Sequence, residues 1–241
     1  MAEKTFKERV RAGEHLCGFS CPMTVEREHF KKVVEANDYD FVFTDGQHSA
    51  YSDDRLVAFC QMATEFGLPV RFRPMHPRQT YLIGHYLDLG PSGIEVPLAE
   101  SEEIAEEAVE NFYYPPMGRR SWGGGSRLRI GDFPDMRQYA DWWNANGVLW
   151  LQIESAWAAV HVSILAKTGV DAFSFGPSDL AFNLEGHSDT GLKTVDECIV
   201  FVVRALENTD VRISYRIGSR ENRQKYADMG VTMFLEGMPA V

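Results

Sequence analysis

Short apolar runs alternate with amphipathic segments along almost the whole chain. The segments between the runs carry apolar residues at helical spacing, as Val25, Phe30, Val33 and Val34 do in 24–37. The pattern predicts strands at 16–20, 40–44, 69–73, 93–98, 148–153, 171–175, 211–216 and 231–236. It predicts helices at 4–13, 24–37, 52–67, 78–89, 101–112, 135–146, 156–168, 194–208 and 219–229.

Eight strands that alternate with helices over 241 residues favour a single (β/α)8 barrel domain spanning 1–241. A doubly wound open sheet is the second choice. The long segment 113–134, rich in Pro, Gly and Arg, interrupts the alternation, and we expect a lid or binding loop there. Only five residues follow Glu236, so we expect the eighth helix of the barrel to be short or missing.

Composition narrows the class of protein. The chain is 44% hydrophobic and 24% charged, which is typical of a globular protein, and no apolar run approaches the length of a membrane helix. A net charge of −11 argues against nucleic acid or an anionic membrane as a partner. The cysteines lie in or beside apolar segments without zinc-site spacing, so we expect buried thiols in a cytoplasmic protein. These are Cys17, Cys21, Cys60 and Cys198.

The segment 147–180 is a strand, a helix and a second strand, and each strand is followed by a carboxylate. Glu154 comes directly after the first strand, and Asp179 lies in the turn that we expect after the second. A right-handed crossover would bring both to the same edge, where two carboxylates repel unless a cation lies between them. We therefore predict a divalent metal held by Glu154 and Asp179. A helix cap or a solvated turn residue is the alternative for each.

Other polar residues also follow predicted strands and would meet on the carboxyl-end face of a barrel. Taken singly, each has a purely structural explanation: His48 could be a turn residue, Arg73 could close the barrel mouth, and Gln152 could be an interior amide with its hydrogen bonds satisfied. Because these residues would converge from four separate strand ends, an active site is the favoured interpretation. The candidates are Asp45, His48, Arg73, Gln152, Gly176 and Ser178, with the backbone amides of the last two expected in a tight turn.

Several motifs along the chain resemble the HpcH/HpaI-type class II pyruvate aldolases. The resemblance covers about 16–237, and its most specific elements are QIE and GPSDL. The motifs are TDGQHS at 44–49, RFRP at 71–74, LDLG at 87–90, YYPPMGRRS at 113–121, LQIES at 151–155 and FGPSDLA at 175–181.

The resemblance implies a metal-dependent barrel that cleaves a 4-hydroxy-2-oxo acid to pyruvate, or a close 2-oxo acid, and an aldehyde. It implies that Glu154 and Asp179 bind Mg²⁺, Mn²⁺ or Co²⁺, and that Asp88 reaches across a subunit interface. In this scheme Arg73 stabilises the enolate, and His48, oriented by Asp45 or Asp88, removes the C4 hydroxyl proton. This chain departs from the family pattern at Gln47, where a glutamate is usual.

Two other functions stay open at this point. The same enolate chemistry could decarboxylate oxaloacetate or form a carbon–carbon bond, and His48 would then matter less. A non-catalytic barrel that binds a small dicarboxylate is the other alternative, and Gln47 and the reduced eighth helix favour it.

The reduced eighth helix also leads to a prediction about the oligomeric state. Without an eighth helix, the apolar outer face of the last and first strands would need a cover, either from residues 1–13 or from another subunit. We therefore predict a homo-oligomer, a trimer or a hexamer, with no nucleic acid or membrane among its partners.

Overall fold

A computed structural model describes residues 3–187 and 191–240. Its described strands form one closed barrel of parallel strands in sequence order, from β1 to β8, with β8 paired to β1. The (β/α)8 barrel is therefore confirmed, and the doubly wound open sheet is wrong. The strands are β1 (Leu16–Ser20), β2 (Phe41–Asp45), β3 (Val70–Arg73), β4 (Gly93–Val96), β5 (Val148–Ile153), β6 (Ala172–Phe175), β7 (Arg212–Gly218) and β8 (Met233–Glu236).

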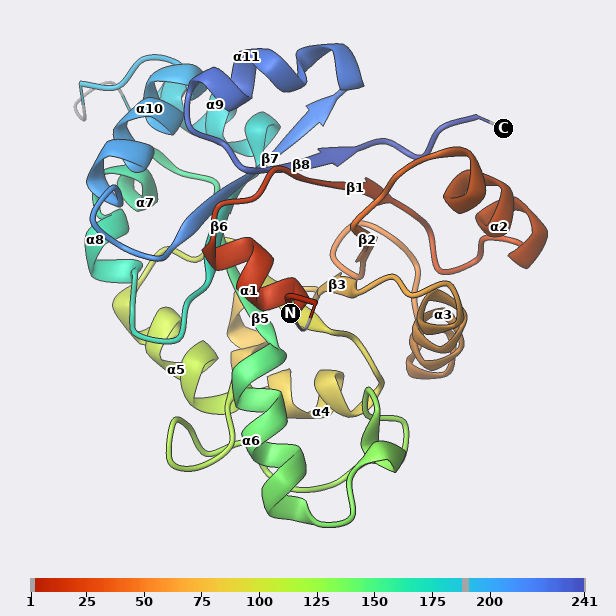
Figure 1. Ribbon diagram of the computed structural model, residues 1–241. Helices are drawn as coiled ribbons and strands as arrows, with labels where there is room; N and C mark the ends of the chain where they lie inside the picture. Colours follow the sequence, from red (N-terminus) through yellow and green to blue (C-terminus); the bar gives the residue numbers. More distant parts are fainter. Residues whose placement is uncertain (1–2, 188–190, 241) are drawn as a thin grey trace.

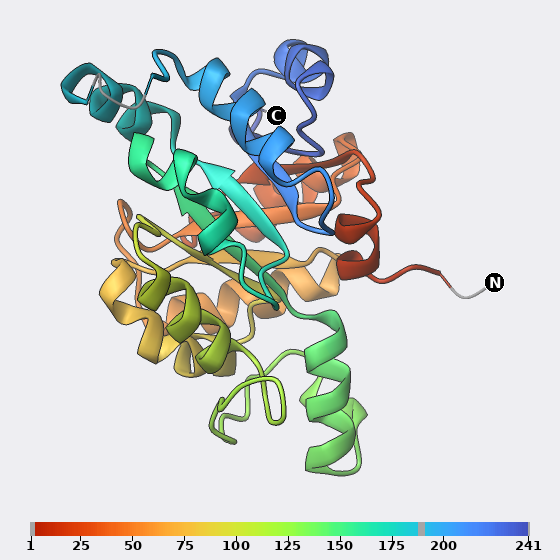
Figure 2. The same ribbon diagram turned by 90° about the vertical axis from the view of Figure 1, so that its left-hand side faces the viewer.

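The helices form a ring outside the barrel, which Figure 1 shows. Figure 2 shows the two ends of the barrel, with α1 in red at one end and α9 in dark teal at the other. The helices are α1 (Phe6–Arg11), α2 (Arg27–Ala36), α3 (Asp53–Glu65), α4 (Ile83–Asp88), α5 (Glu102–Phe112), α6 (Met136–Asn146), α7 (Ala156–Val160), α8 (Val162–Leu165), α9 (Pro177–Gly186), α10 (Val195–Ala205) and α11 (Arg223–Asp228). Among the residues that the structure describes, the 3₁₀ helices are η1 (Pro77–Leu82), η2 (Ile130–Asp132) and η4 (Arg220–Asn222).

Serine, threonine and aspartate caps explain where many of these helices begin. The Ser155 hydroxyl accepts a hydrogen bond from the Ala158 amide, which caps the start of α7 two residues after Glu154. The predicted helix 156–168 is broken at His161 into α7 and α8, and the predicted helix 78–89 begins as the 3₁₀ helix η1. Helix boundaries of this kind depend on local hydrogen bonding that apolar spacing does not encode.

The interior of the barrel is layered from an apolar end to a polar end. Apolar side chains fill its amino-terminal part, and polar side chains follow toward the carboxyl ends of the strands. The apolar layer consists of Val10, Leu16, Phe41, Phe43, Val148, Trp150, Ala172, Met233 and Leu235. Opposite Phe43 in strand register, the buried Arg71 side chain forms an ion pair with Glu95 and donates to the Ser214 hydroxyl at 2.8 Å. The polar end is therefore the part of the barrel that can hold a polar ligand.

Helix α1 closes the amino-terminal end of the barrel instead of covering its outer face. The Phe6 ring packs on Phe41 and Trp150, with centroids 5.8 and 6.2 Å apart. Lys7 is buried, and its Nζ lies 3.2 Å from the Asp171 carboxylate and donates to the Gly147 carbonyl at 2.7 Å. The expectation that residues 1–13 could substitute for an eighth helix is therefore wrong.

The outer face of β8 and β1 is covered within the single chain. Cys17, Phe19 and Phe234 are all buried. The Tyr39 ring packs 4.7 Å from Phe19, and the guanidinium of Arg223 lies 5.0 Å from the Phe234 ring. An uncovered apolar face is therefore not a reason for assembly. Residues 237–240, which follow β8, form neither helix nor strand, and a short or missing eighth helix stays a prediction.

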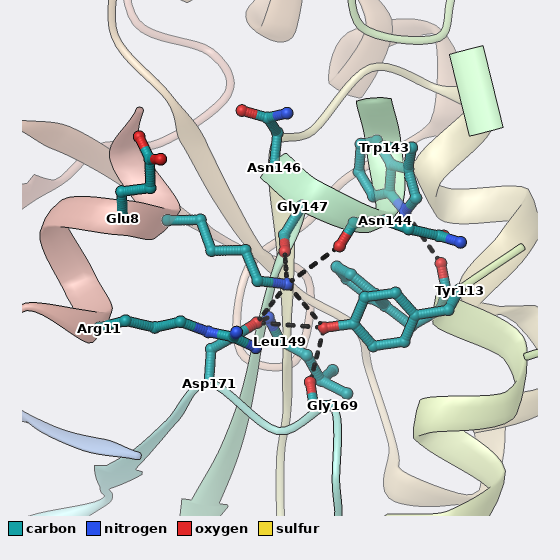
Figure 3. Close-up of polar contacts among 12 residues, drawn as sticks. Glu8, Arg11, Tyr113, Trp143, Asn144, Asn146, Gly147, Leu149, Gly169 and Asp171 are labelled. Atoms are coloured by element: carbon teal, nitrogen blue, oxygen red, sulfur yellow. Dashed lines mark hydrogen bonds and ion pairs between the residues drawn. The ribbon is translucent and has the colours of Figure 1, made fainter. Parts of the chain in front are cut away.

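The fully buried Asp171 carboxylate joins α1 to the amino-terminal end of the barrel. It forms ion pairs with Lys7 and Arg11, and it accepts hydrogen bonds from the Leu149 amide at 3.0 Å and the Tyr113 hydroxyl at 3.2 Å. Figure 3 shows Arg11, Asp171 and Tyr113 converging at this point. Burial lowers the pKa of Lys7, and the charge of Asp171 opposes this shift.

We predict that Asp171→Ala lowers the free energy of unfolding by about 3–5 kcal/mol, because it leaves the Lys7 ammonium buried without its counter-ion. Urea denaturation of the folded variant measures this change. Asp141→Ala is the matched control, because Asp141 forms an exposed ion pair with Arg137 and its loss should cost at most about 0.5 kcal/mol. Equal unfolding free energies for the two variants would contradict the assignment.

Candidate active site

A cavity of about 320 Å³ opens at the carboxyl ends of the strands. Eight of the nine candidates from the sequence line it: Asp45, His48, Arg73, Gln152, Glu154, Gly176, Ser178 and Asp179. Asp88 does not line it. The remaining lining residues are Ser20, Phe43, Ser49, Pro177 and Arg216.

Arg73 is fixed at the centre of this cavity. Its Nε and Nη2 donate to the two oxygens of Asp45 at 2.9 and 2.8 Å, and its Nη1 donates to Gln152 Oε1 at 3.1 Å. Burial alone would raise the pKa of Asp45, but the Arg73 guanidinium outweighs it and holds that pKa below its usual range. The bidentate pair therefore presents a rigid, charged donor group in a site largely shielded from water.

The sequence analysis expected Asp45 or Asp88 to orient the His48 ring. Asp45 does not do so. Its carboxylate oxygens accept hydrogen bonds from the backbone amides of Gln47 and His48 at 2.9 and 3.3 Å, in addition to those from Arg73. The His48 side chain is exposed, and no residue in 3–187 or 191–240 hydrogen-bonds to its ring. Asp45 thus shapes the turn that carries His48, and the position of the imidazole is not set by a hydrogen bond from the described residues.

Glu154 and Asp179 face the same cavity from neighbouring strand ends. Burial raises the pKa of Glu154 to about 7, and the negative charge of Asp179 also raises it. Glu154 Oε2 accepts a hydrogen bond from the Leu98 amide at 2.8 Å. A Cβ at position 176 would lie 2.3 Å from Glu154 Oε1, so Gly176 leaves the space that this oxygen occupies.

Two carboxylates with oxygen atoms facing a cavity fit a hard divalent cation such as Mg²⁺ or Mn²⁺. A cation between them would offset the repulsion and the burial that raise the pKa of Glu154. Within 3–187 and 191–240, no group of three or more His, Cys, Asp and Glu side chains is arranged to bind a metal. Glu154 and Asp179 would therefore bind it with most of its coordination positions left to water and substrate.

The segment after β6 is a helix and not the turn expected from the sequence. Asp179 lies in the first turn of α9, directly after Pro177 and Ser178. The Gly176 amide is not available to a ligand, because it donates to the Ile153 carbonyl at 3.0 Å. The first amides of a helix have no acceptor within it, so those of Ser178 and Asp179 are the donors that α9 offers to an anion.

Asp88 lies outside the cavity. Its Oδ1 accepts a hydrogen bond from Arg120 Nη2 at 2.8 Å, and its side chain packs against Gly124. Burial raises the pKa of Asp88, although Arg120 opposes the shift. One chain therefore does not bring Asp88 to His48.

Sequence reasoning missed Arg216 and Ser20, which also line the cavity. Arg216 lies on β7, where polar Arg212, Ser214 and Arg216 alternate with apolar Ile213 and Tyr215. This period of two was the available signal, because it places Arg216 on the same side of the strand as the interior Ser214.

The fold and the cavity define the class: a (β/α)8 barrel with paired carboxylates and a clamped arginine at the carboxyl-end face, where barrel enzymes have their active sites. The profile of the HpcH/HpaI aldolase/citrate lyase family matches residues 25–238. The chain therefore belongs to the HpcH/HpaI aldolase/citrate lyase family, as its motifs indicated.

Individual relatives agree with this assignment. The hydroxypyruvate/pyruvate aldolase of Delftia acidovorans is 29% identical over 240 residues, covering 97% of this chain and 86% of that protein. The one from Roseobacter denitrificans is 31% identical over 181 residues, covering 75% and 69%. The crystal structure of an HpcH/HpaI aldolase from Desulfitobacterium hafniense superposes with a TM-score of 0.83 at 27% identity, covering 98% and 91%.

Proposed function

We propose that this protein is a divalent-metal-dependent aldolase that reversibly cleaves a 4-hydroxy-2-oxo acid to pyruvate, or a close 2-oxo acid, and an aldehyde. The observation that carries the proposal is the Glu154–Asp179 pair facing the same cavity as the clamped Arg73, in a chain of the aldolase family. The four cysteines are free and buried, which supports a cytoplasmic location where thiols stay reduced.

The reaction develops negative charge on the C2 oxygen of the substrate as the C3–C4 bond breaks. Arg73 would donate to this oxygen, and its contacts with Asp45 and Gln152 hold the guanidinium in place before charge develops. A bound divalent ion supplies Lewis-acid stabilisation of the same enolate. The amides of Ser178 and Asp179 at the start of α9 would bind the C1 carboxylate.

His48 is the proposed base for the C4 hydroxyl proton. It is exposed at the cavity, and its backbone is fixed by Asp45 while its ring is not. Gln47, next to it, has a buried Oε1 that accepts no hydrogen bond from the described residues, and this oxygen could accept one from a bound water. An unfixed imidazole also favours the second candidate, oxaloacetate decarboxylation, which requires no base at C4.

We predict that Glu154→Ala and Asp179→Ala each abolish Mn²⁺ binding in calorimetry and pyruvate release in a coupled assay. The barrel should still fold, because neither side chain belongs to the apolar core. Chelator treatment of the unmodified protein should have the same effect on activity. Full pyruvate release from stripped protein in excess chelator would refute the metal-dependent mechanism.

A finer test uses Gly176. In Gly176→Ala the new methyl group would displace the Glu154 carboxylate, so Mn²⁺ affinity should fall by roughly 10–100-fold, as when a group that orients a ligand is lost. Gly186→Ala is the matched control at the other end of α9, where a Cβ would meet no atom within 4 Å. Equal Mn²⁺ affinities for the two variants would contradict the placement of Glu154.

Substitution of His48 separates the two candidate reactions. His48→Ala should lower aldol cleavage by roughly 10²–10⁴-fold, which is the range for loss of a general base. Oxaloacetate decarboxylation should change much less, because Arg73 and the bound metal suffice for enolate stabilisation. Steady-state rates of pyruvate formation from both substrates measure the difference, and equal losses would assign His48 a positioning role.

The enzyme is proposed to act as a homo-oligomer, a trimer or a hexamer. Asp88 does not line the cavity of its own chain. Exposed apolar side chains lie on the two segments that meet beside Asp88, residues 77–88 and 113–134. These include Tyr81, which is 61% exposed, and Trp122, which is 40% exposed. Such side chains often mark contacts between subunits.

We predict that light scattering at micromolar concentration gives the mass of a trimer or a hexamer. Tyr81→Glu should dissociate it, because the new charge would be buried in the contact. Glu28→Gln on α2, in a separate part of the helix ring, serves as the control. A stable, fully active monomer would refute this assembly.

A further inference from the structure

A second cavity, of about 380 Å³, lies at the opposite end of the barrel from the candidate active site. It opens beside the residues that directly precede three successive strands: Pro69 before β3, Ser92 before β4 and Gly147 before β5. Helices α1 and α6, which lie side by side at this end (Figure 1), contribute to its walls. The described lining residues of the two cavities do not overlap, so a molecule bound in this amino-terminal cavity would not occupy the catalytic centre.

The walls of the amino-terminal cavity are mainly apolar. Phe6 of α1, Trp142 of α6 and Leu128 of the segment 113–134 line it, and each of these side chains is only partly buried. A cavity of this size, with an apolar lining and a few polar groups, is typical of a site for a small molecule. Aromatic side chains from two different helices favour a ligand that carries a flat ring. The other apolar lining residues are Leu68, Pro69 and Trp143.

Arg129 gives the amino-terminal cavity its charge. It is the charged residue among the described side chains that line this cavity, in a protein whose net charge is −11. Its guanidinium lies 5.5 Å from the centre of the Trp142 ring, and its Nε forms an exposed ion pair with Asp132. An exposed pair of this kind contributes little to stability and can be exchanged for a bound anion. The charge of the cavity therefore favours a ligand that is negatively charged.

The backbone conformation of Arg129 is a second indication of a binding role. Its φ angle is 58°, in the left-handed region that favours glycine. The chain thus has an arginine at a position where glycine would be less strained, and the exposed pair with Asp132 compensates little for the strain. Residues held in such conformations are found preferentially at functional sites.

Two hydroxyl groups supply hydrogen-bond donors to the same cavity. Thr5 Oγ1 accepts a hydrogen bond from the Glu8 amide at 3.3 Å, and Ser92 Oγ accepts one from the Val70 amide at 3.1 Å. Because each hydroxyl oxygen accepts from the backbone, its hydrogen is left to donate to a ligand. A polar group on the ligand therefore meets donors as well as the positive charge of Arg129.

We propose that the amino-terminal cavity binds a small carboxylic acid that carries an aromatic ring. Arg129 binds the carboxylate, because a planar guanidinium matches a carboxylate with two parallel hydrogen bonds. The ring lies among Phe6, Leu128 and Trp142, which provide apolar contact on both sides of the cavity. The site is separate from the proposed aldolase reaction, because none of these residues lines the catalytic cavity.

The test compares an acid with its neutral amide, since the two have nearly the same shape and differ in charge. In calorimetry, the unmodified protein should bind 3-phenylpropanoate roughly 10-fold more tightly than 3-phenylpropanamide, the effect of a charge-assisted hydrogen bond. Arg129→Gln should remove this preference. Arg137→Gln is the matched control, because Arg137 forms a similar exposed ion pair with Asp141 but does not line the cavity, and this variant should keep the preference. Equal affinities for acid and amide in the unmodified protein, or an unchanged preference in Arg129→Gln, overturn the proposal.

Two further variants separate binding from folding. Glycine adopts the left-handed conformation without strain, so Arg129→Gly should not lower the midpoint of urea denaturation, although it should lose the preference for the acid. A lower midpoint with an unchanged preference would assign Arg129 a structural role and overturn the proposal. Thr64→Phe, at an exposed position that lines the cavity, should weaken binding of both compounds because the larger side chain fills the space. Unchanged affinities in this variant would place the ligand elsewhere.

Competition distinguishes this site from the catalytic cavity and from a contact between subunits. Saturating pyruvate and Mn²⁺ should leave the affinity for 3-phenylpropanoate unchanged, because the two cavities lie at opposite ends of the barrel. Competition would place the acid in the catalytic cavity, and failure of both compounds to bind would mean that the amino-terminal cavity is closed or covered by another subunit. Either result overturns the proposal. Because none of these measurements requires turnover, their outcome does not depend on the aldolase assignment.

Discussion

The ion pair between Arg73 and Asp45 is the interaction on which the active site depends. Strand register places the two residues directly opposite each other on β2 and β3, so their side chains meet at the carboxyl-end mouth of the barrel. The same carboxylate accepts the amides of Gln47 and His48, and Arg73 also holds Gln152. One pair therefore fixes the Arg73 guanidinium, the turn that carries His48, and an interior amide, and neither member of the pair is left as an unpaired charge in a low-dielectric site.

A buried carboxylate lies at each end of the barrel, and the two are paired to different extents. At the amino-terminal end, Asp171 is surrounded by donors from Lys7, Arg11, Leu149 and Tyr113, so its negative charge is fully paired. At the carboxyl-terminal end, Glu154 accepts one backbone hydrogen bond and otherwise faces a cavity. A carboxylate left incompletely paired in this way is a candidate for binding a ligand.

The sequence was sufficient for the barrel and for eight of the cavity residues, because both follow from regular patterns. The strand predicted at 148–153 has the same limits as β5, and residues after successive parallel strands meet on one face of a barrel. The rest required the coordinates. Apolar spacing in 156–168 continues through His161, where hydrogen bonding breaks the helix. The start of α9 at Pro177 is not marked by any apolar periodicity. The partners of Asp45 depend on strand register, which pattern alone did not provide.

The charged side chains are distributed unevenly around the cavity. Glu154 and Asp179 line the cavity after β5 and β6, the Arg73–Asp45 pair lies at the ends of β3 and β2, and Arg216 extends from β7 to within 5.1 Å of the centre of the Phe43 ring. Negative charge is therefore concentrated after β5 and β6, while the guanidinium groups of Arg73 and Arg216 line the same cavity from β3 and β7. The proposed aldol cleavage would use this arrangement, because the two carboxylates that would bind a metal and the arginine that would stabilise an enolate face one cavity.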